Sequence, residues 1–302
     1  MRTILLGPQR RPVLDAVVRA FPEGSFATVT AGWQEREPDD GELQALLGGR
    51  GAGLSLYRRW LDVQERDPEY AAGARALSGV LDELADLYLL RLDYALQAVY
   101  ALQHRTADLS GAAVAEAVGA VRALDAAHLE RVNEVRGEFF ERLRPHERPV
   151  IAAHRASVAG LLGPAAALVV AGGHVGVLAE VLHLFNVASL LRSPVIAWSA
   201  GAMALTDRIV LFHDRAPQGP GHPEIYGSGL SVLRNLVLLP HAHARLLLGD
   251  GPRMAVFARR FAPARCIPLE AGTRIDTDGD GRCPPETRTL ALDGRVTSLE
   301  AA

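Results

Sequence analysis

A serine in the segment Val195-Ile-Ala-Trp-Ser-Ala-Gly-Ala-Met203 is the residue best placed to do chemistry. An apolar run typical of a buried strand leads directly into Ser199, and a helix-forming stretch follows it. This is the context of a nucleophile elbow, in which a sharp turn exposes a hydroxyl beside a helix N-terminus. Ala197 stands where the G-x-S-x-G pattern has its first glycine. The alternative interpretation is that Ser199 only caps the helix.

Two glycines follow another apolar run, Ala167 to Ala171. The backbone N–H groups of such a turn can point at a negative charge, as an oxyanion hole requires. Gly172 and Gly173 would then lie close to a reacting carbonyl, and His174 would be near enough to contact a substrate. The alternative is an ordinary turn between a strand and a helix.

A histidine pair, His241 and His243, follows a third apolar run that ends at Pro240. If the strands are parallel, His241 lies at the same sheet edge as Ser199. The two histidines face the same side only where the chain is extended, so both need not serve one site. A surface histidine is the alternative. No third ligand stands at a suitable spacing, so we expect no metal.

Two acidic residues could hold the histidine in place, because a catalytic triad needs only one carboxylate on the remote ring nitrogen. Glu270 follows the apolar run Cys266 to Leu269 and precedes Ala271-Gly272, which predicts a carboxylate at a strand end. Asp214 precedes a loop rich in proline and glycine, which suits the wall of a pocket. We favour Glu270 as the third member. Either residue could instead be a surface or helix-cap charge.

These motifs in this order resemble the peptidase E and cyanophycinase family of serine peptidases, peptidase family S51: Gly172-Gly173, Trp198-Ser-Ala-Gly-Ala202, Pro240-His241 and Glu270-Ala-Gly-Thr273. The resemblance covers about residues 150–280 and, weakly, the first two expected strands. It implies a fold like that of class I glutamine amidotransferases. It also implies hydrolysis of a small peptide or isopeptide, including substrates that contain Asp, without a metal or organic cofactor.

The resemblance assigns roles to individual residues. Ser199 matches the family's nucleophile, His241 its histidine and Glu270 the carboxylate of a Ser-His-Glu triad. The N–H groups of Gly173 and Ala200 match the donors of the oxyanion hole.

Four further residues are candidates for substrate contact. Asp214 matches another acidic position near the site of the dipeptidase branch. Trp33 follows the expected second strand, at the same edge of a parallel sheet, although a solvated loop is the alternative. Arg245 is close to His241 in the chain. His174 stands where the two branches carry other residues, so the resemblance supports hydrolase chemistry rather than either branch's specificity.

The elements that must position these residues have an α/β pattern. Continuous apolar runs at 3–6, 167–171 and 195–198 predict a parallel sheet covered on both faces. We therefore expect an α/β fold with a mostly parallel, doubly wound sheet, forming a single domain over residues 1–302. A helical insertion at about 57–148 interrupts it.

The insertion carries apolar residues at steps of three or four, from Leu77 to Leu102 and again from Val114 to Leu143. This period predicts two long helices in an antiparallel hairpin. The hairpin could be an arm or lid packed on the body. Because so much apolar surface needs a partner, we expect a homodimer built at least partly on residues 71–143.

Composition excludes several classes of function. The 302 residues carry a net charge of −3, and all 32 basic residues are Arg, which excludes a catalytic lysine and gives no support for nucleic-acid binding. We expect no membrane span or signal peptide, and a cytoplasmic location. Two cysteines make no disulfide framework. The segment Asp276-Thr-Asp-Gly-Asp-Gly281 resembles the start of a calcium loop, but an acidic hairpin turn fits it better.

Three hypotheses for function remain. The first is a serine hydrolase acting on a peptide or isopeptide bond. The second is a non-catalytic binding protein on the same scaffold, with the helical arm holding a partner. The third is an amidotransferase-like enzyme, which the serine disfavours because an alcohol is a weaker nucleophile than a thiol.

Overall fold

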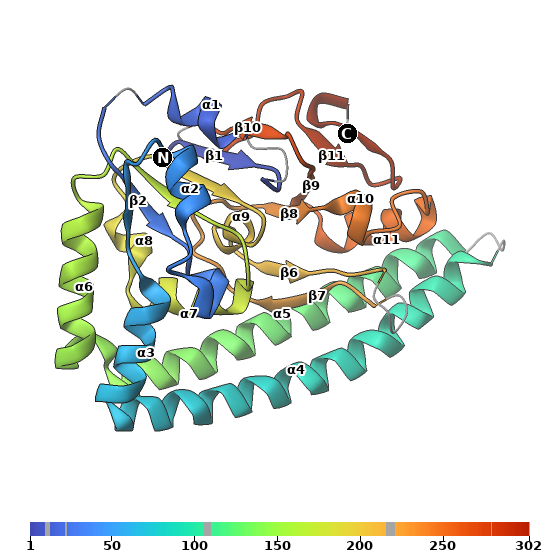
Figure 1. Ribbon diagram of the computed structural model, residues 1–302. Coiled ribbons are helices and arrows are strands. Elements are labelled where there is room, and N and C mark those ends of the chain that lie inside the picture. The colour runs from blue at the N-terminus through green and yellow to red at the C-terminus, as the bar shows by residue number, and fades with distance from the viewer. Residues whose placement is uncertain (10–12, 22, 106–109, 216–220, 279, 302) are drawn as a thin grey trace.

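The computed structural model describes residues 1–9, 13–21, 23–105, 110–215, 221–278 and 280–301. Its largest sheet, within these residues, has six strands in the order β10-β1-β5-β4-β2-β3 (Figure 1). Five of the strands are parallel: β1 (Thr3–Leu6), β2 (Phe26–Val29), β3 (Gly51–Gly53), β4 (Ala167–Val170) and β5 (Val195–Trp198). β10 (Arg274–Asp276) runs antiparallel to β1. The predicted mixed α/β fold with a mostly parallel sheet is therefore confirmed.

Helices cover both faces of this sheet, which explains why its strands have no polar side. Leu5 and Val170 point to one face, into a core shared with α3 (Leu56–Arg66), α6 (Pro149–Leu162) and α7 (Val175–Leu184). Ile4 and Val169 point to the other face, toward α1 (Leu14–Val18) and α2 (Gly41–Leu46). The carboxyl ends of β1, β4 and β5 consequently meet at one edge.

The remaining strands form two smaller sheets, which differs from the expectation of a single sheet. β8 (Leu236–Pro240) and β9 (Arg265–Leu269) pair in parallel and continue into β11 (Arg288–Leu290) and β12 (Val296–Ser298). β6 (Ile209–Leu211) and β7 (Glu224–Gly227) form a separate antiparallel pair. The physical reason is that β10 occupies the edge of β1, so β8 and β9 cannot extend the large sheet there.

The predicted helical hairpin is confirmed as α4 (Pro68–Gln103) and α5 (Ser110–Leu143). At about 1.5 Å per residue each helix is about 50 Å long. The pair lies along one side of the body, with α5 next to β7 and α11 (Gly251–Phe261) (Figure 1). Tyr88, Leu92 and Val99 of α4 pack against Val121 of α5 and Val256 of α11. The apolar series read from the sequence is thus largely buried within the chain.

A buried ion pair fastens this hairpin to the body. The Arg260 guanidinium on α11 donates to both carboxylate oxygens of Asp125 on α5, at 2.6 and 2.7 Å. It also donates to the Tyr88 hydroxyl of α4 at 2.9 Å and to the carbonyl of Pro223 at 2.6 Å. The Tyr88 hydroxyl in turn accepts from the Ile225 N–H of β7. One network therefore joins two hairpin helices, α11 and the strand that they cover.

The short helical elements complete the chain: η1 (Ala31–Arg36), η2 (Pro145–Glu147), α8 (Val187–Leu190), α9 (Ala200–Ala204), α10 (Ala242–Arg245) and η3 (Leu299–Ala301). None of the helices formed by the described residues is both long enough and apolar enough to cross a membrane.

Candidate active site

Ser199 has an unusual backbone conformation, with φ 50° and ψ −127°, between β5 and α9. An L-residue is strained there by about 1–3 kcal/mol, and this is the sharp turn that a nucleophile elbow needs. Ser199 occupies the N-cap position of α9, but its side chain makes no capping hydrogen bond to that helix. Ala200 begins α9, and the N–H of a first helical residue has no acceptor within its own helix.

The glycine turn lies against Ser199. A Cβ placed on Gly172 would lie 2.8 Å from the Ser199 Cβ and 3.5 Å from its hydroxyl oxygen, so no side chain fits there. Gly173 has φ 120°, which favours glycine. A Cβ on Gly201 would overlap the carbonyl oxygens of Val170 and Ala171, so glycine lets α9 pack directly on the end of β4. The absence of a side chain at Gly172 and at Gly201 lets the β4–α7 turn lie next to Ser199.

Ser199 and His241 line the same open cleft, of about 590 Å³, at the carboxyl ends of the strands. His241 follows β8 and has left-handed backbone angles, φ 56° and ψ 37°. The two residues come from different sheets, so the cleft forms at the seam between those sheets. Other residues singled out in the sequence line it as well: Gly172, Gly173, Ala200, Trp33 and Arg245.

Glu270 follows the carboxyl end of β9, as His241 follows that of the neighbouring strand β8. Pro240 of β8 is in register with Leu269 of β9, and the His241 N–H donates to the Leu269 carbonyl at 3.1 Å. The Glu270 carboxylate, however, accepts from the backbone N–H of His243 at 2.8 Å and contacts its ring Nδ1 at 2.9 Å. The structure therefore joins Glu270 to the second histidine of the pair.

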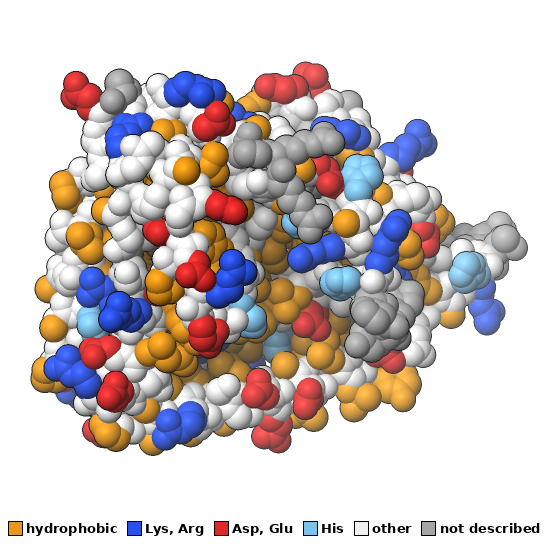
Figure 2. All heavy atoms as spheres, viewed as in Figure 1, with side chains coloured by type: hydrophobic (Ala, Val, Ile, Leu, Met, Phe, Trp, Pro, Cys, Tyr) orange, Lys and Arg blue, Asp and Glu red, His pale blue; other side chains and the backbone are white. Residues whose placement is uncertain are grey.

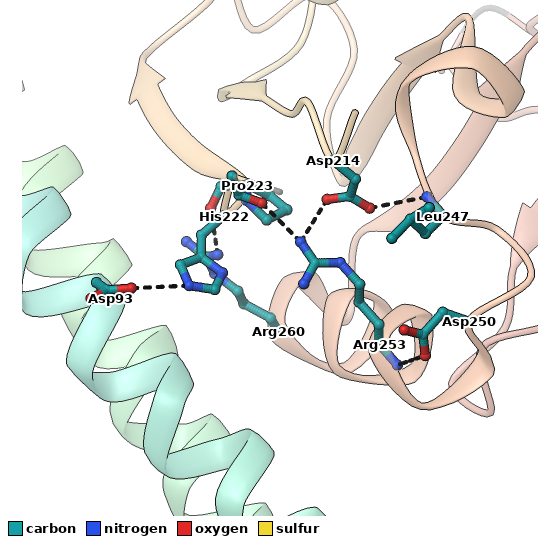
Figure 3. A network of polar contacts seen from close by, with 9 residues as sticks. Asp93, Asp214, His222, Pro223, Leu247, Asp250, Arg253 and Arg260 are labelled. Atoms are coloured by element: carbon teal, nitrogen blue, oxygen red, sulfur yellow. Dashed lines mark hydrogen bonds and ion pairs between the residues drawn. The ribbon is translucent and has the colours of Figure 1, made fainter. Parts of the chain in front are cut away.

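Asp214 is fully buried and lies in a structural ion pair. One carboxylate oxygen is 2.6 Å from the Arg253 guanidinium, and the other accepts from the Leu247 N–H at 3.0 Å (Figure 3). The Asp214 N–H donates to the Arg245 carbonyl at 2.7 Å. Asp214 thus ties the segment after β6 to the chain between α10 and α11.

His174 also has a structural partner. Its ring Nδ1 accepts from the Val177 N–H at 3.2 Å, which caps the N-terminus of α7. Its backbone N–H donates to the Gly32 carbonyl of η1 at 2.7 Å, and η1 also carries Trp33.

Several cleft residues were not found in the sequence. Gln9 lies in the segment after β1, Glu42 lies at the start of α2, and both line the cleft. Met203 and Leu211 form an apolar part of its wall. Gln9 had a detectable signal, because it follows a parallel strand that ends at the same edge as β5. Gln34, beside Trp33, has φ 57° and ψ −123°, nearly the angles of Ser199, and no sequence pattern predicts that.

The acidic segment at 276–281 lies outside the cleft, and its residue 279 is not among those described. Asp276 is paired with Arg2 and Arg274, and the Asp278 carboxylate accepts from the N–H groups of Asp280 and Arg282. These contacts are typical of a turn stabilised by its own side chains. The described residues contain no group of three His, Cys, Asp or Glu side chains that could hold a metal ion.

Comparison with known proteins gives likenesses to solved structures and no family. No protein-family model matches the sequence, and no curated protein matches it. The crystal structure of a peptidase from an acI-B1 Actinobacterium is similar over 97% of this chain and 91% of that chain, with 12% identity and a TM-score of 0.44. A likeness of this degree assigns no function.

Proposed function

We propose that this protein is a serine hydrolase that cleaves a small peptide or isopeptide bond. The observation that carries the proposal is the strained backbone of Ser199 between a buried strand and a helix, in a cleft that His241 also lines. Strained residues persist where the surrounding structure holds them, and they gather at active sites. A serine that lines such a cleft and whose side chain makes no capping hydrogen bond is suited to nucleophilic attack.

In the proposed reaction, the Ser199 hydroxyl attacks the scissile carbonyl while His241 takes its proton. The N–H groups of Gly173 and Ala200 stabilise the oxyanion, each by about 3 kcal/mol. His241 then gives the proton to the leaving amine, and an acyl-enzyme remains. Water, activated by the same histidine, releases the acid and restores the serine.

We propose Glu270 as the carboxylate that orients the catalytic histidine. The register of β8 and β9 supports this role, because His241 and Glu270 each follow directly on the paired residues Pro240 and Leu269. Glu270 contacts His243, which is not the proposed catalytic histidine, so the two histidines must be tested separately. Trp33 and Arg245 are the proposed substrate contacts, and the Arg245 guanidinium suits a carboxylate on the substrate. The cleft contains no proposed cofactor.

The amidotransferase alternative has less support. Burial raises the pKa of the Cys266 thiol to about 12 and that of Cys283 to about 11. Neither thiol is therefore a ready nucleophile at neutral pH. A non-catalytic binding protein remains the main competitor, and loss of activity on substitution of the serine separates it from a hydrolase.

We also propose that the protein forms a homodimer through α4. Val80, Leu87 and Tyr94 recur every seven residues, and they are 43%, 54% and 66% exposed. Leu90, 58% exposed, lies between two of them. Apolar residues that recur every seven positions are typical of a helix that packs against a partner helix, here α4 of a second copy. The face differs from the buried apolar series on which the sequence-based expectation rested.

The direct test of the hydrolase is a screen of dipeptides and isopeptides with wild-type protein and the Ser199→Ala variant. We expect hydrolysis by the wild type and its loss in the variant, with the melting temperature nearly unchanged. Ser231→Ala is the matched control, because Ser231 also has a positive φ, 54°, but is exposed outside the cleft. Equal activity of Ser199→Ala and wild type would exclude Ser199 as the nucleophile.

A further inference from the structure

A second cavity, of about 160 Å³, lies between the helical hairpin and the body. Residues of α4, α5, α7 and β7 line it, and Figure 2 shows the molecular face hollowed above the hairpin. A cavity of about 150 Å³ is large enough to hold a benzene ring. This space is therefore suited to a small molecule with one ring.

The walls of the cavity are rich in rings. Tyr88 and His128 stack with their ring centroids 4.0 Å apart. Phe140 and Tyr226 line it as well. Gly176 of α7 leaves room for Tyr226, because a Cβ there would overlap the Tyr226 hydroxyl. Aromatic faces of this kind attract both an apolar ring and a cation.

The charged side chains that line the cavity include more carboxylates than cations. Three carboxylates, those of Asp82, Glu180 and Glu224, line it together with one guanidinium, that of Arg136. His128 and His183 add no positive charge at neutral pH, because burial lowers the pKa of each.

Glu180 and Glu224 are the two half-buried carboxylates of the cavity, and they differ in their neighbours. Burial raises the pKa of Glu180, and this is opposed in part by the Trp60 indole N–H, from which the carboxylate accepts at 2.8 Å, and by Arg136. Burial raises the pKa of Glu224, and the nearby cation that opposes this is Arg260. That guanidinium already donates to Asp125, Tyr88 and the Pro223 carbonyl. A half-buried carboxylate whose neighbouring cation is committed elsewhere favours a ligand that brings its own positive charge.

We propose that this cavity binds a small primary amine that carries one aromatic ring, with the ammonium at Glu224 and the ring among Tyr88, Phe140 and Tyr226. The site is separate from the cleft of Ser199. The two sites have no described lining residue in common, and they approach each other at the β6–β7 pair, where Leu211 of the cleft is in register with Glu224 of the cavity.

Isothermal titration calorimetry at pH 7.5 with three probes that share a phenylethyl group tests this site. The probes are phenethylamine, which is cationic, 2-phenylethanol, which is neutral, and 3-phenylpropanoate, which is anionic. We expect saturable one-site binding of phenethylamine, at least tenfold tighter than that of the other two probes. Equal or tighter binding of the alcohol or the acid, or no saturable binding of the amine, would overturn the assignment.

Variants locate the binding. Glu224→Gln keeps the shape of the side chain, and we expect it to weaken phenethylamine at least tenfold. Leu81→Trp should abolish binding by filling the cavity. Glu138→Gln, on an exposed part of α5, is the matched control and should bind as wild type does. Ser199→Ala should also bind the amine normally, so failure of the proposed hydrolase leaves this result unaffected. Unchanged binding by Glu224→Gln would contradict the proposal.

Discussion

At the scale of single residues, local pattern predicts the strand–turn–helix context of Ser199 but not the contacts of the carboxylates. The elbow depends on a strand, a turn and a helix within about ten residues, all of which can be read from the sequence. The partner of a carboxylate depends on segments far apart in the chain. Asp214 meets Arg253 across 39 residues, and no periodicity predicts that contact.

Two substitutions distinguish the carboxylates. Glu270→Gln should lower kcat on the order of 10⁴-fold with little change in KM, as loss of the orienting carboxylate requires. Asp214→Asn should instead lower the free energy of unfolding by about 2 kcal/mol, because it weakens the buried ion pair with Arg253. Steady-state kinetics and thermal denaturation of both variants measure these effects.

His243→Ala is the control for Glu270, since it removes the histidine that now contacts this carboxylate. We expect His243→Ala to keep kcat within a few-fold and His241→Ala to lose activity. The opposite order would make His243 the catalytic histidine. A fall in kcat in Asp214→Asn at unchanged stability would exchange the roles of the two acids.

At the scale of elements, the lengths and pairing of α4 and α5 follow from the 3.6-residue period, but their packing does not. The same stripe of apolar residues can face a neighbouring helix, the body or a second copy. In the structure, Tyr88, Leu92 and Val99 face α5 and α11. The sequence pattern also does not predict the division of the strands into three sheets, because β10 pairs with the edge of β1 from about 270 residues away in the chain.

The attachment of the hairpin should depend on Asp125. Asp125→Ala leaves the Arg260 guanidinium buried without its carboxylate, which costs about 3–5 kcal/mol of stability. Urea denaturation monitored by circular dichroism measures this loss. Glu134→Ala is the control, because its ion pair with Arg131 lies on the surface and contributes little. Similar stabilities of the two variants would contradict the anchoring role of Asp125.

At the scale of the whole molecule, the exposed face of α4 leads to a prediction about assembly. Light scattering at micromolar concentration should give twice the chain mass of 32.4 kDa. Leu90→Glu places a charge in the proposed seam and should give a monomer. Glu69→Gln, near the start of the same helix, should stay dimeric. A folded wild-type monomer would exclude this interface.

The central claim, that Ser199 is an activated nucleophile, is tested most directly by covalent labelling. A fluorophosphonate probe reacts with a serine that a neighbouring base activates, and peptide mass spectrometry locates the modified residue. The account predicts labelling of wild type at Ser199, loss of labelling in Ser199→Ala and His241→Ala, and normal labelling of Ser231→Ala. Folded wild-type protein that remains unlabelled, or that is labelled at another serine, would contradict it.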